Sequence, residues 1–178
     1  MVELREGERL IATSTPTPLE LEVPAPVSVA AATAAAIHYP GFRTMPDSGC
    51  FVCGPARTDG LRVFPGKLVH QSLECVAAPW QPDGSLAGTR NAVRPEFLWA
   101  ALDCPGYFAA SPDARPMLLG SIHCRIDDPL GIDEPCVIVG WSLGASGRKH
   151  RAATALYGVG GRPVARAIAT WIELKPRG

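Results

Sequence analysis

The sequence predicts an α+β domain in which one antiparallel sheet wraps around a long central helix. A segment that begins near Pro95 is apolar on every side, which is typical of a helix buried all round. Strand-like segments precede and follow this helix. The last of them places Ala165, Ala167 and Ala169 on one face, where small side chains let a helix approach closely. A single sheet curled around one helix is the simplest way to bury both.

Two strands are expected before the helix. Residues 61–64 form a short apolar run closed by Pro65-Gly66, and residues 67–78 form a longer one. In the longer run, one face carries the side chains of Val69, Leu73, Cys75 and Ala77. Residues 79–90, with Pro82-Asp83-Gly84, are predicted to be a loop.

The central helix is expected to begin at Pro95, because the first helical position does not need an N–H group. Glu96 in the first turn faces the positive end of the helix dipole. Residues 97–102 are all apolar. The segment 104–106, Cys-Pro-Gly, is expected to break or kink the helix, since the residue before a proline avoids helical angles.

Four antiparallel strands are predicted after the helix, at 116–127, 135–143, 148–159 and 162–174. Gly160-Gly161 between the last two is a strong hairpin signal. A split βαβ fold is the main competitor, but it needs a second long helix near the end of the chain. The residues after Arg148 show no helical period, so the sheet around one helix is favoured.

The first 48 residues are interpreted as an extension packed on the main domain, which spans residues 49–178. The extension is rich in Pro, Thr, Ala and Gly. Within it, residues 19–23 alternate like a short strand, residues 29–37 could form an alanine-rich helix, and residues 45–49 are predicted to be a loop.

Composition restricts the possible partners. The 178 residues are 47% hydrophobic and 19% charged, and 17 basic residues balance 17 acidic ones. A neutral total gives no electrostatic reason to expect nucleic acid or an anionic membrane as a partner. No apolar run approaches the roughly 20 residues that span a bilayer, and residues 1–6 lack the pattern of a secretory signal. We therefore expect a cytoplasmic protein with neither a nucleic-acid nor a membrane partner.

Three stretches resemble a group of uncharacterised bacterial hotdog proteins related to acyl-CoA thioesterases. They are Cys-Phe-Val-Cys-Gly-Pro at 50–55 with Asp-Gly-Leu-Arg-Val-Phe at 59–64, Trp-Ala-Ala-Leu-Asp-Cys-Pro-Gly at 99–106, and the final hairpin. The resemblance implies a hotdog fold, a homodimer or dimer of dimers formed by edge-to-edge sheets, and an acyl thioester ligand linked to coenzyme A. In such thioesterases a carboxylate on the central helix acts as base or nucleophile. The loop before that helix often reads His-Gly-Gly, whereas residues 91–95 here read Asn-Ala-Val-Arg-Pro.

Asp103 is the first candidate for catalysis. It lies toward the end of the predicted helix, near the negative pole of the dipole, among apolar residues. Both effects disfavour its charged form and should raise its pKa, as a general base near neutral pH requires. The alternative is a carboxylate that only caps N–H groups near Pro105.

Four further residues could contact the substrate. Glu96 lies two helical turns before Asp103 on the same face and could serve as the base, or could simply favour the helix dipole. Asn91 could donate to a thioester carbonyl, or could be an ordinary turn residue. Trp99 is expected to line the substrate site. In the basic run 147–151, Arg148 and Lys149 could bind coenzyme A phosphates, or could protect a strand edge from aggregation.

The cysteines are interpreted as unpaired. Four of the six, at 75, 104, 124 and 136, lie in apolar segments and are expected to be buried thiols. Cys50 and Cys53 have half the spacing of a zinc site. His70 and Cys75 would complete a ligand set only from opposite faces of one predicted strand, and His38 is another possible ligand. We therefore interpret 50–55 as a knuckle-like turn shaped by its Gly-Pro, and we predict neither a metal nor a cofactor.

The leading functional hypothesis is hydrolysis of an acyl-CoA thioester, with Asp103 as general base or nucleophile. The alternative is a non-catalytic protein that binds an acyl or other lipophilic small molecule in the same pocket.

Overall fold

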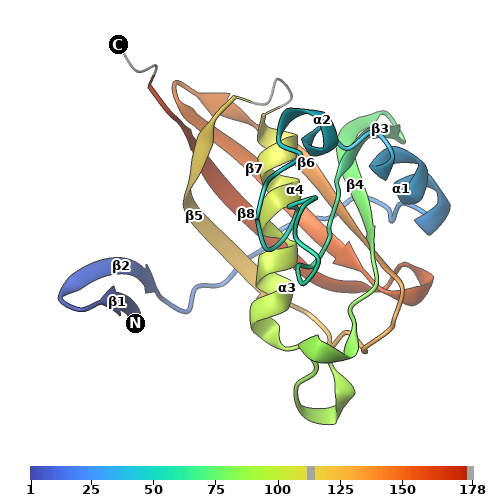
Figure 1. The fold of residues 1–178 in the computed structure, drawn as a ribbon, viewed down its shortest axis with the longest axis horizontal. Coiled ribbons are helices and arrows are strands. Elements are labelled where there is room, and N and C mark those ends of the chain that lie inside the picture. Colours follow the sequence, from blue (N-terminus) through green and yellow to red (C-terminus); the bar gives the residue numbers. More distant parts are fainter. Residues whose placement is uncertain (112–114, 176–178) are drawn as a thin grey trace.

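The computed structural model describes residues 1–111 and 115–175, and its centre is a six-stranded antiparallel sheet (Figure 1). The strand order is β3-β4-β6-β7-β8-β5. A separate two-stranded sheet, β1-β2, lies near the N-terminus. The predicted combination of one antiparallel sheet with helices is thus confirmed. The bounds of the six strands are Gly66–His70 (β3), Leu73–Trp80 (β4), Met117–Ile126 (β5), Cys136–Ser146 (β6), Lys149–Tyr157 (β7) and Pro163–Glu173 (β8).

The central helical segment consists of two consecutive helices, α3 (Pro95–Ala101) and α4 (Asp103–Ala110), rather than one long helix. The start at Pro95 is as predicted. The break lies at Leu102, one turn earlier than expected, and the chain remains helical through the Cys-Pro-Gly segment. Pro105 has no N–H for the carbonyl four residues before it, so the ladder is interrupted at that turn. In the first turn of α4 the missing N–H needs no partner.

The packing of this segment on the sheet follows from small residues on both sides. Leu98 of α3 and Leu102 at the break share one core cluster with Ala165 and Ala167 of β8. The predicted alanine row therefore does face the helices. The closest approach is at Gly140 of β6, where a Cβ atom would lie 2.6 Å from the carbonyl oxygen of Pro105.

The opposite side of the helical segment is less covered than its apolar sequence suggests. Trp99 is 36% exposed, and Phe97 and Ala100 are half-buried. The prediction of burial on every side was therefore wrong. Residues 50–64 cross this side as a loop, without the strand predicted at 61–64. Instead, the N–H groups of Leu61 and Val63 donate to the carbonyls of residues 51 and 52, at 2.7 and 2.9 Å.

The strand expected at 67–78 is a hairpin, β3-β4. Gln71 and Ser72 form its turn with φ of 48° and 68°. Two-residue hairpin turns with positive φ at both positions favour Asn-Gly, so a Gln-Ser pair gave no turn signal. The four strands predicted after the helix are confirmed within two or three residues at their ends, including the β7-β8 hairpin at Gly160-Gly161.

The outer face of the sheet is covered by the N-terminal part of the chain. Helix α1 (Val29–Ala36) packs on β3 and β4, and its Ala32 lies in a second core cluster with Val137, Val139 and Trp141 of β6. A short helix, α2 (Gly41–Thr44), follows, as do three short 3-10 helices later in the chain: η1 (Gly84–Leu86), η2 (Thr89–Asn91) and η3 (Val159–Gly161).

Residues 17–24 form no strand, although one was expected at 19–23. We call this segment the N-terminal strap. Four side chains of the sheet bond its backbone carbonyls: His123 to Thr17, Arg125 to Leu19, Arg166 to Leu21 and Tyr157 to Pro24, at 2.6–2.9 Å. His123 thus has a structural role, since its ring bonds the Thr17 carbonyl.

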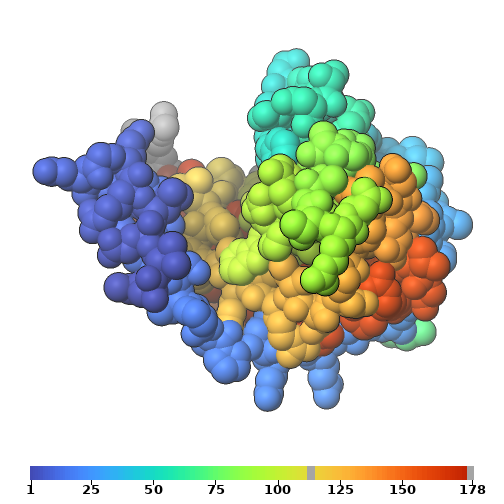
Figure 2. Space-filling model, turned by 90° about the horizontal axis from the view of Figure 1, so that it is seen from below, coloured from blue at the N-terminus to red at the C-terminus, as the bar shows by residue number. Residues whose placement is uncertain are grey.

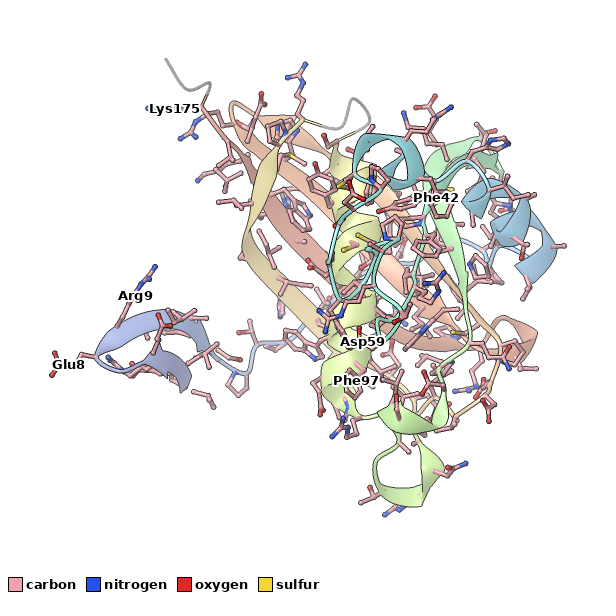
Figure 3. The ribbon with its side chains drawn as sticks, viewed as in Figure 1. Glu8, Arg9, Phe42, Asp59, Phe97 and Lys175 are labelled. Carbon is pink, nitrogen blue, oxygen red and sulfur yellow. The ribbon has the colours of Figure 1, made fainter. Side chains whose placement is uncertain are left out.

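Strands β1 (Val2–Glu6) and β2 (Arg9–Ser14) form a hairpin that the sequence did not predict. Every residue of both strands is exposed. In Figure 2 the hairpin, in dark blue, stands apart from the rest of the molecule. Glu8 and Arg9 lie at its free tip in Figure 3.

Candidate functional site

Asp103 is the first residue of α4 and is half-buried. Its Oδ1 atom is fully buried and has no hydrogen-bond partner within residues 1–111 and 115–175. Burial, and secondarily the charge of Cys50, raises the pKa of Asp103 to about 6. The direction agrees with the prediction, and burial is the larger cause. Asp103 both follows the end of α3 and begins α4, so the dipoles of the two helices act on it in opposite directions.

Glu96 and Trp99 belong to α3, whereas Asp103 begins α4. In a regular helix the spacing of seven residues would place Glu96 on the same face as Asp103, about 10 Å away along the axis. The Glu96 carboxylate is exposed and pairs with Arg94, at 3.4 Å between Oε1 and Nε. Trp99 is also exposed, so among these three predicted site residues only Asp103 carries a buried side-chain oxygen.

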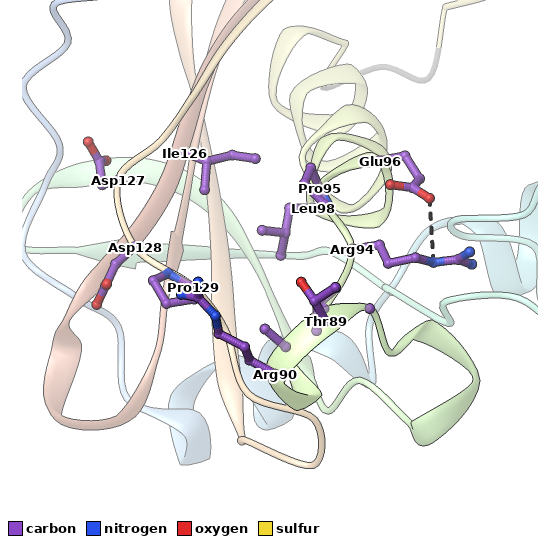
Figure 4. Close-up of a pocket in the computed structure, with 13 residues that line it drawn as sticks. Thr89, Arg90, Arg94, Pro95, Glu96, Leu98, Ile126, Asp127, Asp128 and Pro129 are labelled. Carbon is purple, nitrogen blue, oxygen red and sulfur yellow. Dashed lines mark ion pairs between the residues drawn. The ribbon is translucent and has the colours of Figure 1, made fainter.

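An open pocket of about 720 Å³ lies at the start of α3, between that helix and the end of β5 (Figure 4). Arg90, Arg94 and Glu96 contribute its charged groups on the helix side, and Asp127 and Asp128 contribute those on the strand side. The full lining comprises Gly88, Thr89, Arg90, Ala92, Val93, Arg94, Pro95, Glu96, Leu98, Ile126, Asp127, Asp128 and Pro129.

Asn91 lies beside this pocket, in η2, but it does not line it. Its side chain is exposed, its φ is 56°, and its carbonyl accepts the N–H of Ile132 at 3.1 Å. These features match the turn role that was considered for it. Backbone donors at the start of α3 are few, because Pro95 has no N–H and the N–H of Phe97 donates to the carbonyl of Arg94 at 3.0 Å.

Arg148 and Lys149 lie at the other end of the sheet. Lys149 is opposite Ile172 on β8, whereas Ile126 in the pocket is opposite Ala165. Seven residues along a strand correspond to about 23 Å. Arg148 donates to the carbonyl of Glu173 at 2.9 Å, and Lys149 lines a separate cavity on the outer side of the β6-β7 hairpin. Within one chain, these two residues are therefore not part of the Asp103 site.

A cluster of three thiols that the sequence did not predict adjoins Asp103. The Sγ atoms of Cys50, Cys53 and Cys104 all lie within 4.8 Å of one another. Cys104 follows Asp103 on α4, whereas the other two come from the loop that crosses the helix. Sulfur atoms, in yellow, gather at this crossing in Figure 3. All six cysteines are free thiols. Of the four that were predicted to be buried, Cys75, Cys104 and Cys136 are buried, but Cys124 is only half-buried. Cys75 lies on the outer face of the sheet.

Comparisons with known proteins identify the fold. No family model and no curated protein matches the sequence. Among solved structures, the chain is similar to a thioesterase superfamily protein with a TM-score of 0.64 and 17% identity, over 76% of this chain and 64% of that one. Zebra fish thioesterase superfamily member 2 has a TM-score of 0.60 and 15% identity, over 77% of this chain and 95% of that one. A hypothetical thioesterase from Streptococcus pneumoniae TIGR4, solved with coenzyme A, has a TM-score of 0.53 and 14% identity, over 58% of this chain and 81% of that one.

The chain has the hotdog-type fold of thioesterase superfamily proteins. At these identities the likeness defines the fold, and the chemistry depends on the residues of this chain. No helix within the part of the chain that the structure describes is long and apolar enough to cross a membrane.

Proposed function

We propose that the protein hydrolyses an acyl thioester of coenzyme A, with Asp103 as the general base. The observation that carries this proposal is a desolvated carboxylate on the helical segment of a hotdog fold, with one oxygen that has no partner among the described residues. The structural neighbours of the chain include thioesterase superfamily proteins; one neighbour is solved with coenzyme A and another with acetyl CoA. An unpaired buried acceptor is costly, so its retention favours a functional role.

In the proposed reaction, Asp103 takes a proton from a water molecule as that water attacks the thioester carbonyl. The tetrahedral intermediate then breaks its carbon–sulfur bond. The coenzyme A thiolate leaves and takes up a proton, and the acyl group is released as a carboxylic acid. The substrate would enter through the pocket at the start of α3 and lie along the helical segment that carries Glu96, Trp99 and Asp103.

Glu96 is less suited to act as the base. Its carboxylate is exposed and pairs with the Arg94 guanidinium at 3.4 Å, so it is neither shielded from solvent nor free of a partner. It therefore serves as a matched control on the same helical segment. We assign Glu96 a role in substrate binding or in stabilising the start of α3, and not in proton transfer.

The scarcity of backbone donors at the start of α3 favours a second candidate function. With Pro95 and Phe97 unable to contribute, the N–H of Glu96 is the remaining candidate in the first turn to polarise a carbonyl. A protein of this kind could bind an acyl thioester or another lipophilic molecule without hydrolysing it.

Turnover of a panel of acyl-CoA substrates distinguishes the two functions. Coenzyme A release should be followed by chromatography, because a thiol reagent would also label the cysteines of the protein. We expect Asp103→Asn to lower kcat roughly 10²- to 10⁴-fold, the usual contribution of a general base, and Glu96→Gln to change it only slightly. Unchanged turnover in Asp103→Asn would remove Asp103 from the mechanism. Binding without turnover in the wild type would establish the non-catalytic function.

The position of the coenzyme A phosphates can be tested separately. Arg90 lines the pocket near α3, whereas Arg148 and Lys149 lie at the far end of the same chain. Comparing KM for an acyl-CoA and for the phosphate-free acyl-pantetheine shows which group binds phosphate. If Arg148 and Lys149 do so, their replacement by alanine raises KM for the acyl-CoA alone. Equal effects on both substrates would exclude them.

The homodimer implied by the fold would form at β5. This strand is an edge of the sheet, and its Leu118 and Leu119 are 62% and 40% exposed. An unpaired strand edge with exposed leucines favours pairing with a second copy. Light scattering that gives the mass of a single chain would contradict this arrangement.

A further inference from the structure

The thiols of Cys50, Cys53 and Cys104 converge from two separate parts of the fold. Cys50 and Cys53 lie in the loop that crosses the helical segment, and Cys104 lies in the first turn of α4. Cys104 and Cys53 are buried, while Cys50 is half-exposed, so the cluster can exchange with solvent on one side. Three sulfurs in one place satisfy the ligand preference of a thiophilic divalent cation.

The spacing of the sulfurs fits a tetrahedral metal centre. With a zinc–sulfur distance of about 2.3 Å, two thiolates on one zinc ion lie about 3.8 Å apart. The Sγ atoms of Cys50 and Cys104 are 3.7 Å apart, and no pair in the cluster exceeds 4.8 Å. A disulfide would require about 2.05 Å. The cluster therefore approaches the metal-bound geometry without rearrangement of the backbone.

The loop that carries Cys50 and Cys53 is a tight turn. The N–H of Gly54 donates to the Cys50 carbonyl at 2.9 Å. Gly54 has no room for a side chain, because a Cβ atom would lie 2.3 Å from the carbonyl oxygen of Ser48. The backbone of this turn therefore holds Cys50 and Cys53 close to each other.

The surroundings supply little positive charge for three thiolates. The Arg57 guanidinium is near enough to Cys50 to interact with its charge, but it is exposed and is engaged by Asp59 at 2.8 Å. The Tyr39 hydroxyl, buried beside the cluster, donates to the carbonyl of Cys53 at 3.1 Å. A bound dication would compensate the negative charge that several thiolates in a buried site would otherwise leave unbalanced.

We propose that Cys50, Cys53 and Cys104 bind one zinc ion that fastens the crossing loop to helix α4. Among residues 1–111 and 115–175 the cluster contains no fourth ligand from a His, Cys, Asp or Glu side chain, so solvent occupies the fourth coordination position. This site does not depend on thioester hydrolysis, and the two proposals can fail independently.

The test is metal analysis of protein purified without chelators. We expect one zinc ion per wild-type chain, and almost complete loss of zinc in Cys50→Ser. Cys50 is half-exposed and lies in a loop, so this variant should fold, which circular dichroism verifies. Cys124→Ser is the matched control because Cys124 is also a half-buried free thiol but lies outside the cluster, on β5. It should keep its zinc.

Two further measurements use the same proteins. Replacement of zinc by cobalt should give thiolate-to-cobalt charge-transfer absorption in the wild type and in Cys124→Ser but not in Cys50→Ser. Removal of the metal by a chelator should lower the thermal midpoint of the wild type and leave that of Cys50→Ser unchanged, since metal that binds only the folded state stabilises it. Wild-type protein that binds neither zinc nor cobalt, or that carries a Cys50–Cys104 disulfide when isolated, would overturn the proposal.

Discussion

The packing of α4 on the sheet predicts different effects for two glycine substitutions, Gly140→Ala on β6 and Gly106→Ala on α4. In Gly140→Ala the new Cβ atom would lie 2.6 Å from the oxygen and 2.9 Å from the carbon of the Pro105 carbonyl. These are backbone atoms of a helix packed on the sheet, so relief requires the helix to move. Overpacking of a core costs about 1–3 kcal/mol, and a backbone clash places this variant near the upper limit, at about 3 kcal/mol.

In Gly106→Ala the new Cβ atom would lie 3.4–4.0 Å from Trp171, Thr154 and Ala169, which is ordinary van der Waals contact. Alanine also exceeds glycine in helix propensity by about 0.8–1 kcal/mol, so this variant should equal or exceed the wild type in stability. For a chain of this size, 1 kcal/mol shifts the thermal midpoint by about 2–4 °C. We therefore expect Gly140→Ala to lower the midpoint by roughly 6–12 °C and Gly106→Ala to leave it unchanged or raise it.

The assay is thermal unfolding followed by circular dichroism, with Gly84→Ala as a control, since its Cβ atom would meet nothing within 4 Å. If Gly140→Ala unfolds at the wild-type temperature, or if Gly140→Ala and Gly106→Ala lower the thermal midpoint equally, the described approach of α4 to β6 is wrong. The same helix carries Asp103 and Cys104. A helix displaced by Gly140→Ala should therefore also reduce any turnover or metal binding that depends on them.

Three other predictions concern stability. Burial raises the pKa of Glu134, but backbone N–H groups and Arg162 outweigh burial and hold that pKa below its usual value. The stabilisation of the folded state by Glu134 is therefore full above about pH 4.3 and is lost as the pH falls through the folded pKa. In denaturant unfolding, Glu134→Gln should be less stable than the wild type at pH 7, and a difference that persists undiminished at pH 3 would refute this. Arg166→Met should cost about 1.5–3 kcal/mol in urea unfolding, because the Leu21 carbonyl loses a charged donor; a cost near zero would show that the strap is not held there. Deletion of residues 1–14 should leave the thermal midpoint unchanged, since both hairpin strands are exposed, and a lower midpoint would mean that the hairpin packs on the domain.

The elements that the sequence predicted well are those whose signal is local. The start at Pro95, the four later strands and the hairpin at Gly160-Gly161 each depend on residues within a few positions of one another. The alanine row of β8 was informative for the same reason, because a strand alternates its faces at every residue. The β3-β4 turn was missed because Gln71-Ser72 adopts left-handed angles without the residues that usually favour them.

The features missed at the candidate site depend on tertiary contacts. Cys50 and Cys104 are 54 residues apart, and only the loop that crosses the helix brings their sulfurs together. The sequence does contain a Cys-x-x-Cys-Gly turn and a further cysteine beside the candidate acid. Ligand spacing along the chain, however, favours His70 and Cys75 as the remaining metal ligands. The raised pKa of Asp103 was predicted from its apolar neighbours, which are local, whereas its place in the dipole depended on where the helix breaks.

The strap also gives a structural reason for the prolines in this part of the chain, where a strand was expected at 19–23. The sheet holds this segment through its carbonyl oxygens, by way of His123, Arg125, Arg166 and Tyr157. A proline keeps its carbonyl and lacks only the N–H, which these bonds do not use. Prolines at 16, 18 and 24 are therefore compatible with an ordered strap, and their restricted φ reduces the entropy lost on ordering it. Backbone stiffness from the prolines therefore adds to the packing of Leu19, Leu21 and Val23 in holding the strap in place.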